Sequence, residues 1–126
     1  MLKTGIKGSQ TVTVSGENTA RAMGSGTLEV FATPAMIALM EKTAWQSVAG
    51  ELEEGCGTVG IRLNVTHDAP TPLGGKVTCE SVLTGVEGRK LIFEVQASDE
   101  KGVIGKGIHE RFIVDDRKFQ EKANAR

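Results

Sequence analysis

One long apolar helix is the feature that most limits what this chain can fold into. It begins at Thr33 and Pro34, because threonine is a preferred N-cap residue and proline a preferred first helical residue. Good helix formers fill residues 35–48, and Gly50 is placed to stop the helix. Apolar residues recur at the i, i+3, i+4 spacing of one wide face: Met36, Leu39, Met40, Ala44 and Val48. Because little in the first three turns is polar, we expect a sheet to cover this helix on most sides.

Strand-like alternation replaces the helical pattern after residue 57. Alternating apolar residues predict four long strands, over residues 58–67, 76–86 (with a break in phase near Ser81), 90–98 and 103–114. Residues 85–88 and 99–102 have the length of hairpin connections, so the sheet should be antiparallel. Before the helix, residues 10–14 predict a short strand, and the Gly- and Ser-rich residues 15–27 a mobile loop.

This order of elements predicts the α+β class, with an antiparallel sheet wrapped around one central helix. The 126 residues fit a single domain, 1–126, whose charged tail from about 115 to 126 is frayed or a short helix. An open edge or face of such a sheet is commonly covered by a second copy, so we expect a homodimer or higher homo-oligomer.

Composition excludes several functions. The net charge is −1 with no basic stripe, and the chain has four Phe, one Trp and no Tyr, so nucleic acid is not expected as a partner. No apolar run has the length of a membrane span, and residues 1–8 lack an apolar signal core, so we expect a cytoplasmic protein with no membrane partner. Cys56 and Cys79 lack metal-ligand spacing and are predicted to be free thiols.

Glu41 and His67 are the first candidates for chemistry. Glu41 lies beside the apolar face of the helix, where a carboxylate is costly unless it has a partner or a task, although it could simply be solvated next to Lys42. His67 ends a strand just before a turn and could be either a surface residue or a proton carrier.

Thr33 and Gly60 are candidates with equally strong structural roles. Thr33 either caps the helix or holds its hydroxyl at the positive helix end, facing an oxyanion. Eight helical residues span about 12 Å, so Thr33 and Glu41 of one chain should not touch. Gly60 marks a bulge or a close helix crossing, or leaves a backbone N–H open to polarise a carbonyl.

The run His109-Glu110-Arg111 forms a second cluster, late in the last strand. Alternation places His109 and Arg111 on one face and Glu110 on the other. We favour an exposed ladder of ion pairs there, with binding of an anionic substrate tail as the alternative.

Six segments, taken in order, resemble the fluoroacetyl-CoA thioesterase family, a branch of the hotdog-fold acyl-CoA thioesterases. They are Val30-Phe31-Ala32-Thr33, Leu39-Met40-Glu41, Gly60, Val65-Thr66-His67-Asp68-Ala69-Pro70, Val86-Glu87-Gly88-Arg89 and Gly107-Ile108-His109-Glu110-Arg111. The resemblance runs from about residue 30 to 119. It implies the hotdog fold, in which the sheet wraps the helix, and a homodimer with active sites at the subunit interface.

The resemblance also implies hydrolysis of an acyl-CoA thioester. Thr33, Glu41 and His67 match the family's catalytic threonine, glutamate and histidine, Gly60 matches a glycine that helps hold the substrate carbonyl, and Arg111 matches an arginine of the same His-Glu-Arg motif. Gly24 and Thr27 stand where the fluoroacetyl-specific enzyme carries lid phenylalanines, so a different acyl preference is expected.

Two hypotheses of different class follow from these residues. The first is an acyl-CoA thioesterase that needs no metal and no cofactor beyond the coenzyme A of its substrate. The second is a non-catalytic module that binds an acyl-CoA or another small ligand, since a fold does not fix a function. A dehydratase or hydratase ranks below both.

Overall fold

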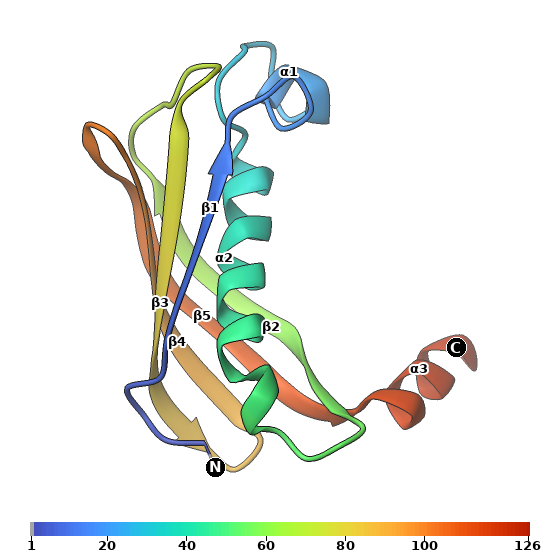
Figure 1. The fold of residues 1–126 in the computed structure, drawn as a ribbon. Coiled ribbons are helices and arrows are strands. Elements are labelled where there is room, and N and C mark those ends of the chain that lie inside the picture. Colours follow the sequence, from blue (N-terminus) through green and yellow to red (C-terminus); the bar gives the residue numbers. More distant parts are fainter. Residues whose placement is uncertain (1) are drawn as a thin grey trace.

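A curved five-stranded antiparallel sheet wraps around one long helix in the computed structural model, which describes residues 2–126 (Figure 1). The elements, in chain order, are β1 (Lys7–Thr13), α1 (Ala20–Met23), α2 (Thr33–Val48), a 3-10 turn (Ala49–Glu51), β2 (Cys56–His67), β3 (Lys76–Glu87), β4 (Lys90–Asp99), β5 (Gly102–Asp115) and α3 (Asp116–Asn124). The predicted α+β architecture is therefore confirmed, and each predicted strand is present with its ends moved by a few residues.

The strand order is β1-β3-β4-β5-β2, with every neighbouring pair antiparallel. Tight turns join β3 to β4 and β4 to β5, as the sequence predicts. The longer connection after His67 instead carries the chain from β2 at one edge of the sheet to β3 near the other. Consequently β2 pairs along its length with β5, and β1 and β2 form the two edges.

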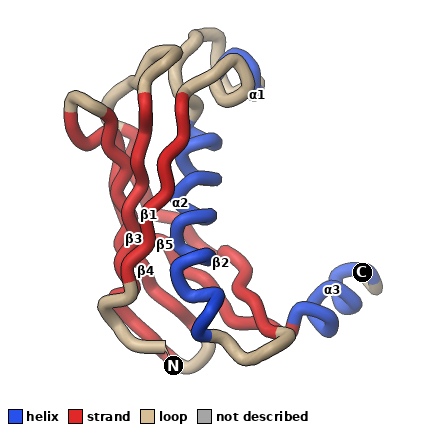
Figure 2. The backbone as a smooth tube through the Cα atoms, in the orientation of Figure 1, coloured by secondary structure: helices blue, strands red, loops and turns tan. Residues whose placement is uncertain are grey.

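The core lies between α2 and the concave face of the sheet (Figure 2). All five residues of the predicted apolar face of α2 are buried: Met36, Leu39, Met40, Ala44 and Val48. They pack against alternate strand residues that include Val77, Leu83, Leu91 and Phe93. Burial of each large side chain contributes about 1.5–3 kcal/mol, so this contact fixes α2 against the sheet.

The ends of α2 differ from the prediction. Ala32 is the N-cap residue and makes no side-chain cap, whereas Thr33 is already helical, with Pro34 after it. Gly50 lies inside the 3-10 turn that follows α2, rather than stopping the helix in the left-handed conformation. The hydroxyl of Thr33 therefore does not cap its own helix.

The sheet covers only one side of α2 in the single chain. Ala38 and Lys42 are exposed, and Trp45 keeps 43% of its surface in solvent. The expectation that α2 is covered on most sides is therefore wrong for one chain. In the first turns of α2, some apolar residues pack against the sheet, whereas others, such as Ala38, are exposed on the side away from it.

Three smaller differences from the prediction concern residues 15–27, the irregularity of β3 and the C-terminal tail. Residues 15–27 hold the short helix α1, capped by the Thr19 hydroxyl, instead of a loop throughout. Ser81 is buried in phase with its neighbours, and the irregularity of β3 lies between Leu83 and Gly85. The charged tail forms α3, which projects away from the sheet (Figures 1 and 2).

Within residues 2–126, no helix combines the length and apolar character needed to cross a membrane.

Gly107 on β5 provides a test of how closely the strands are packed. A Cβ at this position would collide with the backbone of β2, at the carbonyl of Asn64 and the Cα of Val65. Backbone cannot move aside cheaply, so we expect Gly107→Ala to lower the free energy of unfolding by about 1–3 kcal/mol. Gly16→Ala is the matched control, because a Cβ there meets nothing within 4 Å. Urea unfolding of both variants measures the difference, and equal stabilities would contradict this packing.

Candidate active site

Thr33 and His67 form a hydrogen-bonded pair at the N-terminal end of α2. The Thr33 Oγ1 lies 2.7 Å from the His67 Nδ1. α2 supplies the threonine from its first turn, and β2 supplies the histidine from its last residue. The other ring nitrogen, Nε2, is buried without a hydrogen-bond partner among the described residues. In the imidazole of His67, Nδ1 is therefore bonded to the Thr33 hydroxyl, and Nε2 is the nitrogen left for a further partner.

A shallow pocket of about 290 Å³ adjoins this pair. Besides Thr33 and His67, its lining is formed by Ala20, Ser25, Val30, Phe31, Asp68, Ala69 and Pro70. These residues come from α1 and the turn after it, the approach to α2 and the turn after β2, three segments brought together by backbone bonds such as Phe31 N–H to the Thr71 carbonyl. The sequence motifs around Thr33 and His67 thus build the walls of one pocket.

Glu41 lies two turns further along α2 and pairs with Arg111 of β5. The Arg111 Nη1 is 3.4 Å from the Glu41 Oε2. The arginine side chain is 7% exposed and the glutamate side chain 39% exposed, so the pair is buried at its cation and open at its carboxylate. Of the alternatives that the sequence left open for Glu41, the structure shows a partner, and that partner is Arg111.

Gly60 gives the Glu41 carboxylate its room. A Cβ on Gly60 would lie 2.5 Å from the Glu41 Oε2, so a side chain there would displace the carboxylate. The register of β2 against β5 shifts between Gly60 and Arg62, which is the bulge expected for this glycine. A bulge at a sheet edge re-aims the backbone, and here it does so beside a carboxylate.

His109 and Arg111 are buried, which overturns the expected exposed ladder of ion pairs. Both point to the concave side, where His109 is 0% exposed, while Glu110 faces the other way as predicted. Arg111 donates from Nε to the Thr58 hydroxyl and from Nη2 to the Thr58 carbonyl. The five residues Glu41, Thr58, Gly60, His109 and Arg111 are called the Glu41–Arg111 cluster below.

Burial governs the electrostatics of this cluster. It lowers the pKa of His109 below its ordinary value, against the opposing effect of the Arg62 carbonyl, and the charge of Arg111 lowers it further. Burial also lowers the pKa of Arg111, while the nearby Glu41 opposes that change. An arginine stays charged even so, and the lowered pKa of His109 keeps the imidazole neutral at neutral pH.

The five predicted site residues therefore fall into two groups along α2. Thr33 meets His67 at the helix end, and Glu41 meets Gly60 and Arg111 further down. Among the described residues, no hydrogen bond or ion pair joins Glu41 to either member of the Thr33–His67 pair. The separation follows from the eight helical steps from Thr33 to Glu41, or about 12 Å of helix.

The segment around Gly24 and Thr27, which the sequence resemblance sets against a lid, is short and exposed. Gly24 ends α1 in the left-handed conformation at φ 71°, where a Cβ would meet nothing within 4 Å. Thr27 is exposed, and the neighbouring Leu28 is 66% exposed. No aromatic side chain from these positions closes over the pocket beside Thr33.

Both cysteines are free, as predicted, and Cys79 is packed within β3. Burial raises the pKa of the Cys79 thiol above its ordinary value. A thiol held in its protonated form is a poor nucleophile, so this residue serves packing.

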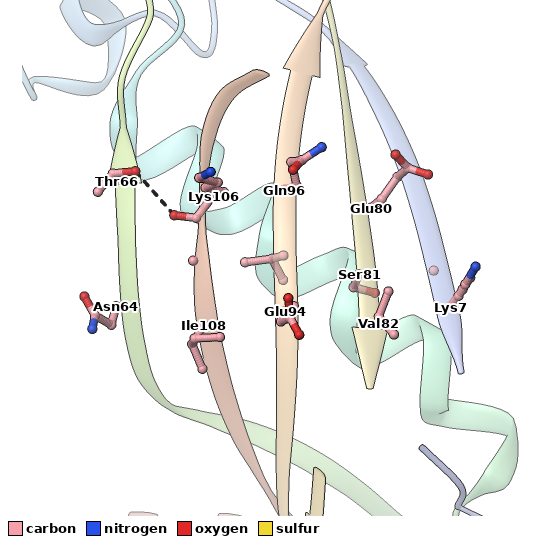
Figure 3. A pocket seen from close by; sticks show the side chains of 13 residues that line it. Lys7, Asn64, Thr66, Glu80, Ser81, Val82, Glu94, Gln96, Lys106 and Ile108 are labelled. Atoms are coloured by element: carbon pink, nitrogen blue, oxygen red, sulfur yellow. Dashed lines mark hydrogen bonds between the residues drawn. The ribbon is translucent and has the colours of Figure 1, made fainter. Parts of the chain in front are cut away.

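A larger hollow of about 670 Å³ lies on the outer face of the sheet, with α2 behind it (Figure 3). Its lining mixes charges of both signs, including Lys7, Lys106, Glu80 and Glu94, with Val82 and Ile108. None of the five predicted site residues lines it. We therefore place the candidate active site on the concave side.

Sequence reasoning missed two members of the Glu41–Arg111 cluster. Thr58 lies in the predicted strand, but nothing in its sequence context indicates an arginine partner. His109 was expected in an exposed ladder of ion pairs, and the apolar neighbours Ile108 and Phe112 give no sign that His109 is the buried residue. In the structure these two side chains are 39% and 38% exposed, on the outer face.

The fold and this site place the chain among the hotdog thioesterases. A hot-dog-like protein from Thermanaerovibrio acidaminovorans matches with a TM-score of 0.88 at 28% identity, over 97% of this chain and 90% of that one. A Thermus thermophilus protein of the thioesterase superfamily matches with a TM-score of 0.85 at 26% identity, over 100% and 98%. The predicted hotdog fold is confirmed.

Closer relatives define the family. A curated fluoroacetyl-CoA thioesterase from Streptantibioticus cattleyicolor is 45% identical over 94 residues, which is 75% of this chain and 68% of that protein. A solved structure of a fluoroacetyl-CoA thioesterase matches with a TM-score of 0.95 at 35% identity, over 100% and 98% of the two chains. The family model for fluoroacetyl-CoA-specific thioesterases matches residues 14–117, and this chain belongs to that family.

The buried His109 makes stability depend on pH. In the unfolded chain this imidazole binds a proton near pH 6.5, whereas in the folded protein its pKa is lower. Below pH 6.5 the unfolded state therefore binds more protons, and the free energy of unfolding falls, by no more than about 1.4 kcal/mol per pH unit for one group. We expect His109→Gln to reduce this fall between pH 7.5 and 5.5, measured by urea unfolding. His67→Gln should retain it, and an unchanged slope in His109→Gln would contradict the assignment.

Proposed function

We propose that this chain hydrolyses the thioester bond of an acyl-CoA, with Thr33, Glu41 and His67 as its catalytic residues. The observation that carries the proposal is that α2 holds a carboxylate, Glu41, two turns after Thr33, whose hydroxyl bonds to His67, in a chain that belongs to a thioesterase family. The reaction needs no group besides water and the substrate.

The carbonyl of the thioester would sit near the N-terminal end of α2. Helix N-termini carry unpaired N–H groups and a partial positive charge, which stabilise an oxyanion. In this proposal the Thr33 hydroxyl is a further donor to the carbonyl. The backbone N–H of Gly60 lies beside Glu41, two turns of α2 away from Thr33, so it would reach the same carbonyl only from a second copy of the chain. Stabilisation by these donors matters most after attack, when negative charge moves onto the carbonyl oxygen.

Glu41 has two routes to the acyl carbon. It can take a proton from water, whose oxygen then bonds to the carbon, or it can attack directly and form an anhydride that water cleaves. In both routes the C–S bond breaks, and the coenzyme A sulfur receives a proton by way of His67. Mass spectrometry of the quenched enzyme distinguishes them, because only direct attack leaves the acyl group on Glu41.

Arg111 serves this chemistry by orienting Glu41. Its Nη1 lies 3.4 Å from the Glu41 Oε2, so the buried guanidinium holds the carboxylate in place on this side. Because only one carboxylate oxygen faces the guanidinium, the other is free to meet water or substrate.

The acyl group is proposed to differ from fluoroacetyl. Gly24 and Thr27 leave the lid segment without aromatic side chains, so larger or more polar acyl groups meet less obstruction there. We further propose that the reaction takes place in the cytoplasm, a reducing compartment that suits the two free cysteines.

A test of the proposed activity compares thiol release from short, branched and aromatic acyl-CoAs. We expect Glu41→Gln, Glu41→Ala and His67→Ala each to lower kcat by about 10²–10⁴, the usual contribution of a positioned acid or base. Glu100→Gln is the matched control, because this exposed glutamate lies in the β4–β5 turn. Full activity in Glu41→Ala would refute the mechanism. Saturable binding without thiol release by the wild type would instead identify a non-catalytic module.

We also propose a homodimer that completes the site. The long edge strand β2 pairs on one side with β5, and its Ile61 is 50% exposed at the bulge. α2 lies mainly over β1 and β3, which leaves the concave side of β2 and β5 less covered beside Glu41. A second copy along β2 would pair this edge, bury Ile61 and enclose the carboxylate.

Sedimentation tests the dimer. We expect a mass of twice 13.4 kDa for the wild type and of one chain for Ile61→Asp, because a carboxylate cannot be buried in an apolar contact at low cost. Ile108→Asp is the control, since Ile108 is 39% exposed on the outer face. A monomeric wild type would contradict the proposal, and so would dissociation by Ile108→Asp alone.

A further inference from the structure

His109 has a defined partner at each ring nitrogen. Its Nδ1 lies 2.9 Å from the carbonyl oxygen of Arg62, next to the bulge in β2. Its Nε2 lies 3.1 Å from the Nη1 of Arg111. Phe93 of β4 stacks on the ring, with 6.3 Å between the centroids and 29° between the planes. The imidazole is thus held in one orientation inside the concave face.

These partners determine where the proton lies. A carbonyl oxygen only accepts, so the Nδ1 of His109 must carry the hydrogen and donate it to Arg62. A guanidinium only donates, so the Nε2 must offer its lone pair to Arg111. Both requirements describe the same neutral tautomer, and complete burial favours the neutral ring.

The partners of Arg111 then fix the direction of its guanidinium. Thr58 accepts from Nε and Nη2, at 2.8 and 2.9 Å. Nη1 is shared between the imidazole of His109 at 3.1 Å and the carboxylate of Glu41 at 3.4 Å. Without the imidazole, Nη1 would keep only the 3.4 Å contact with the carboxylate of Glu41, whose flexible side chain projects from α2.

We propose that His109 is a positioning residue that acts through Arg111: its Nε2 lone pair holds the guanidinium at the place where it orients the Glu41 carboxylate. This inference rests on the proposed function, because it assigns a task to Glu41. The alternative is that His109 merely fills the core between Phe93 and β2. The two differ in which part of the ring matters, since filling space requires no acceptor facing Arg111.

Two replacements separate these roles. Asparagine in His109→Asn can still donate to the Arg62 carbonyl but is too short to reach Arg111, whereas the longer amide of His109→Gln can present an acceptor to Arg111. We expect His109→Asn to lower kcat about 10–100-fold with little change in KM, because small displacements of a catalytic group are costly. His109→Gln should recover most of that loss. Equal kcat in the two variants, whether both reduced or both normal, would overturn the proposal.

An Arg111→Met background tests whether the effect passes through the arginine. If it does, His109→Asn lowers kcat much less in Arg111→Met than in the wild type, the non-additivity expected of residues in one network. Equal losses in both backgrounds would overturn the proposal. Unfolding curves of each variant identify any loss of activity that comes from unfolded protein.

A measurement independent of activity examines the tautomer. The chain has two histidines, so ¹⁵N spectra of the wild type and of His67→Gln assign both rings. At pH 7.5 we expect His109 to show a protonated Nδ1 and an unprotonated Nε2, and the opposite tautomer would overturn the proposal. Failure of the proposed function has a different signature: the wild type would release no thiol from any acyl-CoA, and the positioning role would fall with it.

Discussion

The packing of one face of α2 against the concave sheet is the contact on which the rest of the structure depends. The same helix that buries Met36, Met40 and Val48 carries Thr33 at its first position and Glu41 two turns later. Because the buried face fixes both the rotation and the height of α2, it also fixes which strand residues these two side chains meet. Ordinary core packing therefore sets the geometry of the chemistry.

A buried cation is the second constraint, and the bulge in β2 helps to satisfy it. Removing a guanidinium from water costs several kcal/mol unless its donors find partners. Thr58, His109 and Glu41 supply those partners from three different elements. Such a network favours one arrangement of its members, because displacing any one of them leaves a buried charge less well paired.

Much of this fold and part of this site could be predicted from the sequence. The period of two in the strands and the wide apolar face of α2 predicted the architecture. Thr33 and His67 were both named as candidates, but their hydrogen bond was not predicted. Strand order was beyond reach, because alternation does not say whether β2 pairs with β3 or β5. The prediction that His109 and Arg111 are exposed was wrong. Hydropathy could not reveal their burial, because Ile108 and Phe112 on the outer face are more apolar than the two residues that are buried. Burial there follows hydrogen bonding rather than hydropathy.

The distance between the two groups of site residues argues for a division of labour. His67, proposed as the proton carrier at the helix end, and Glu41 further down cannot share one proton-transfer step within this chain, since about 12 Å of helix separates Thr33 from Glu41. A thioester has two atoms that need protons handled, the attacking oxygen and the departing sulfur. Only a second copy of the chain can bring both groups to one reacting carbon, because a single substrate atom cannot contact two groups about 12 Å apart. The proposed dimer would complete the site beside Glu41, where the exposed side of α2 carries Ala38 and Trp45.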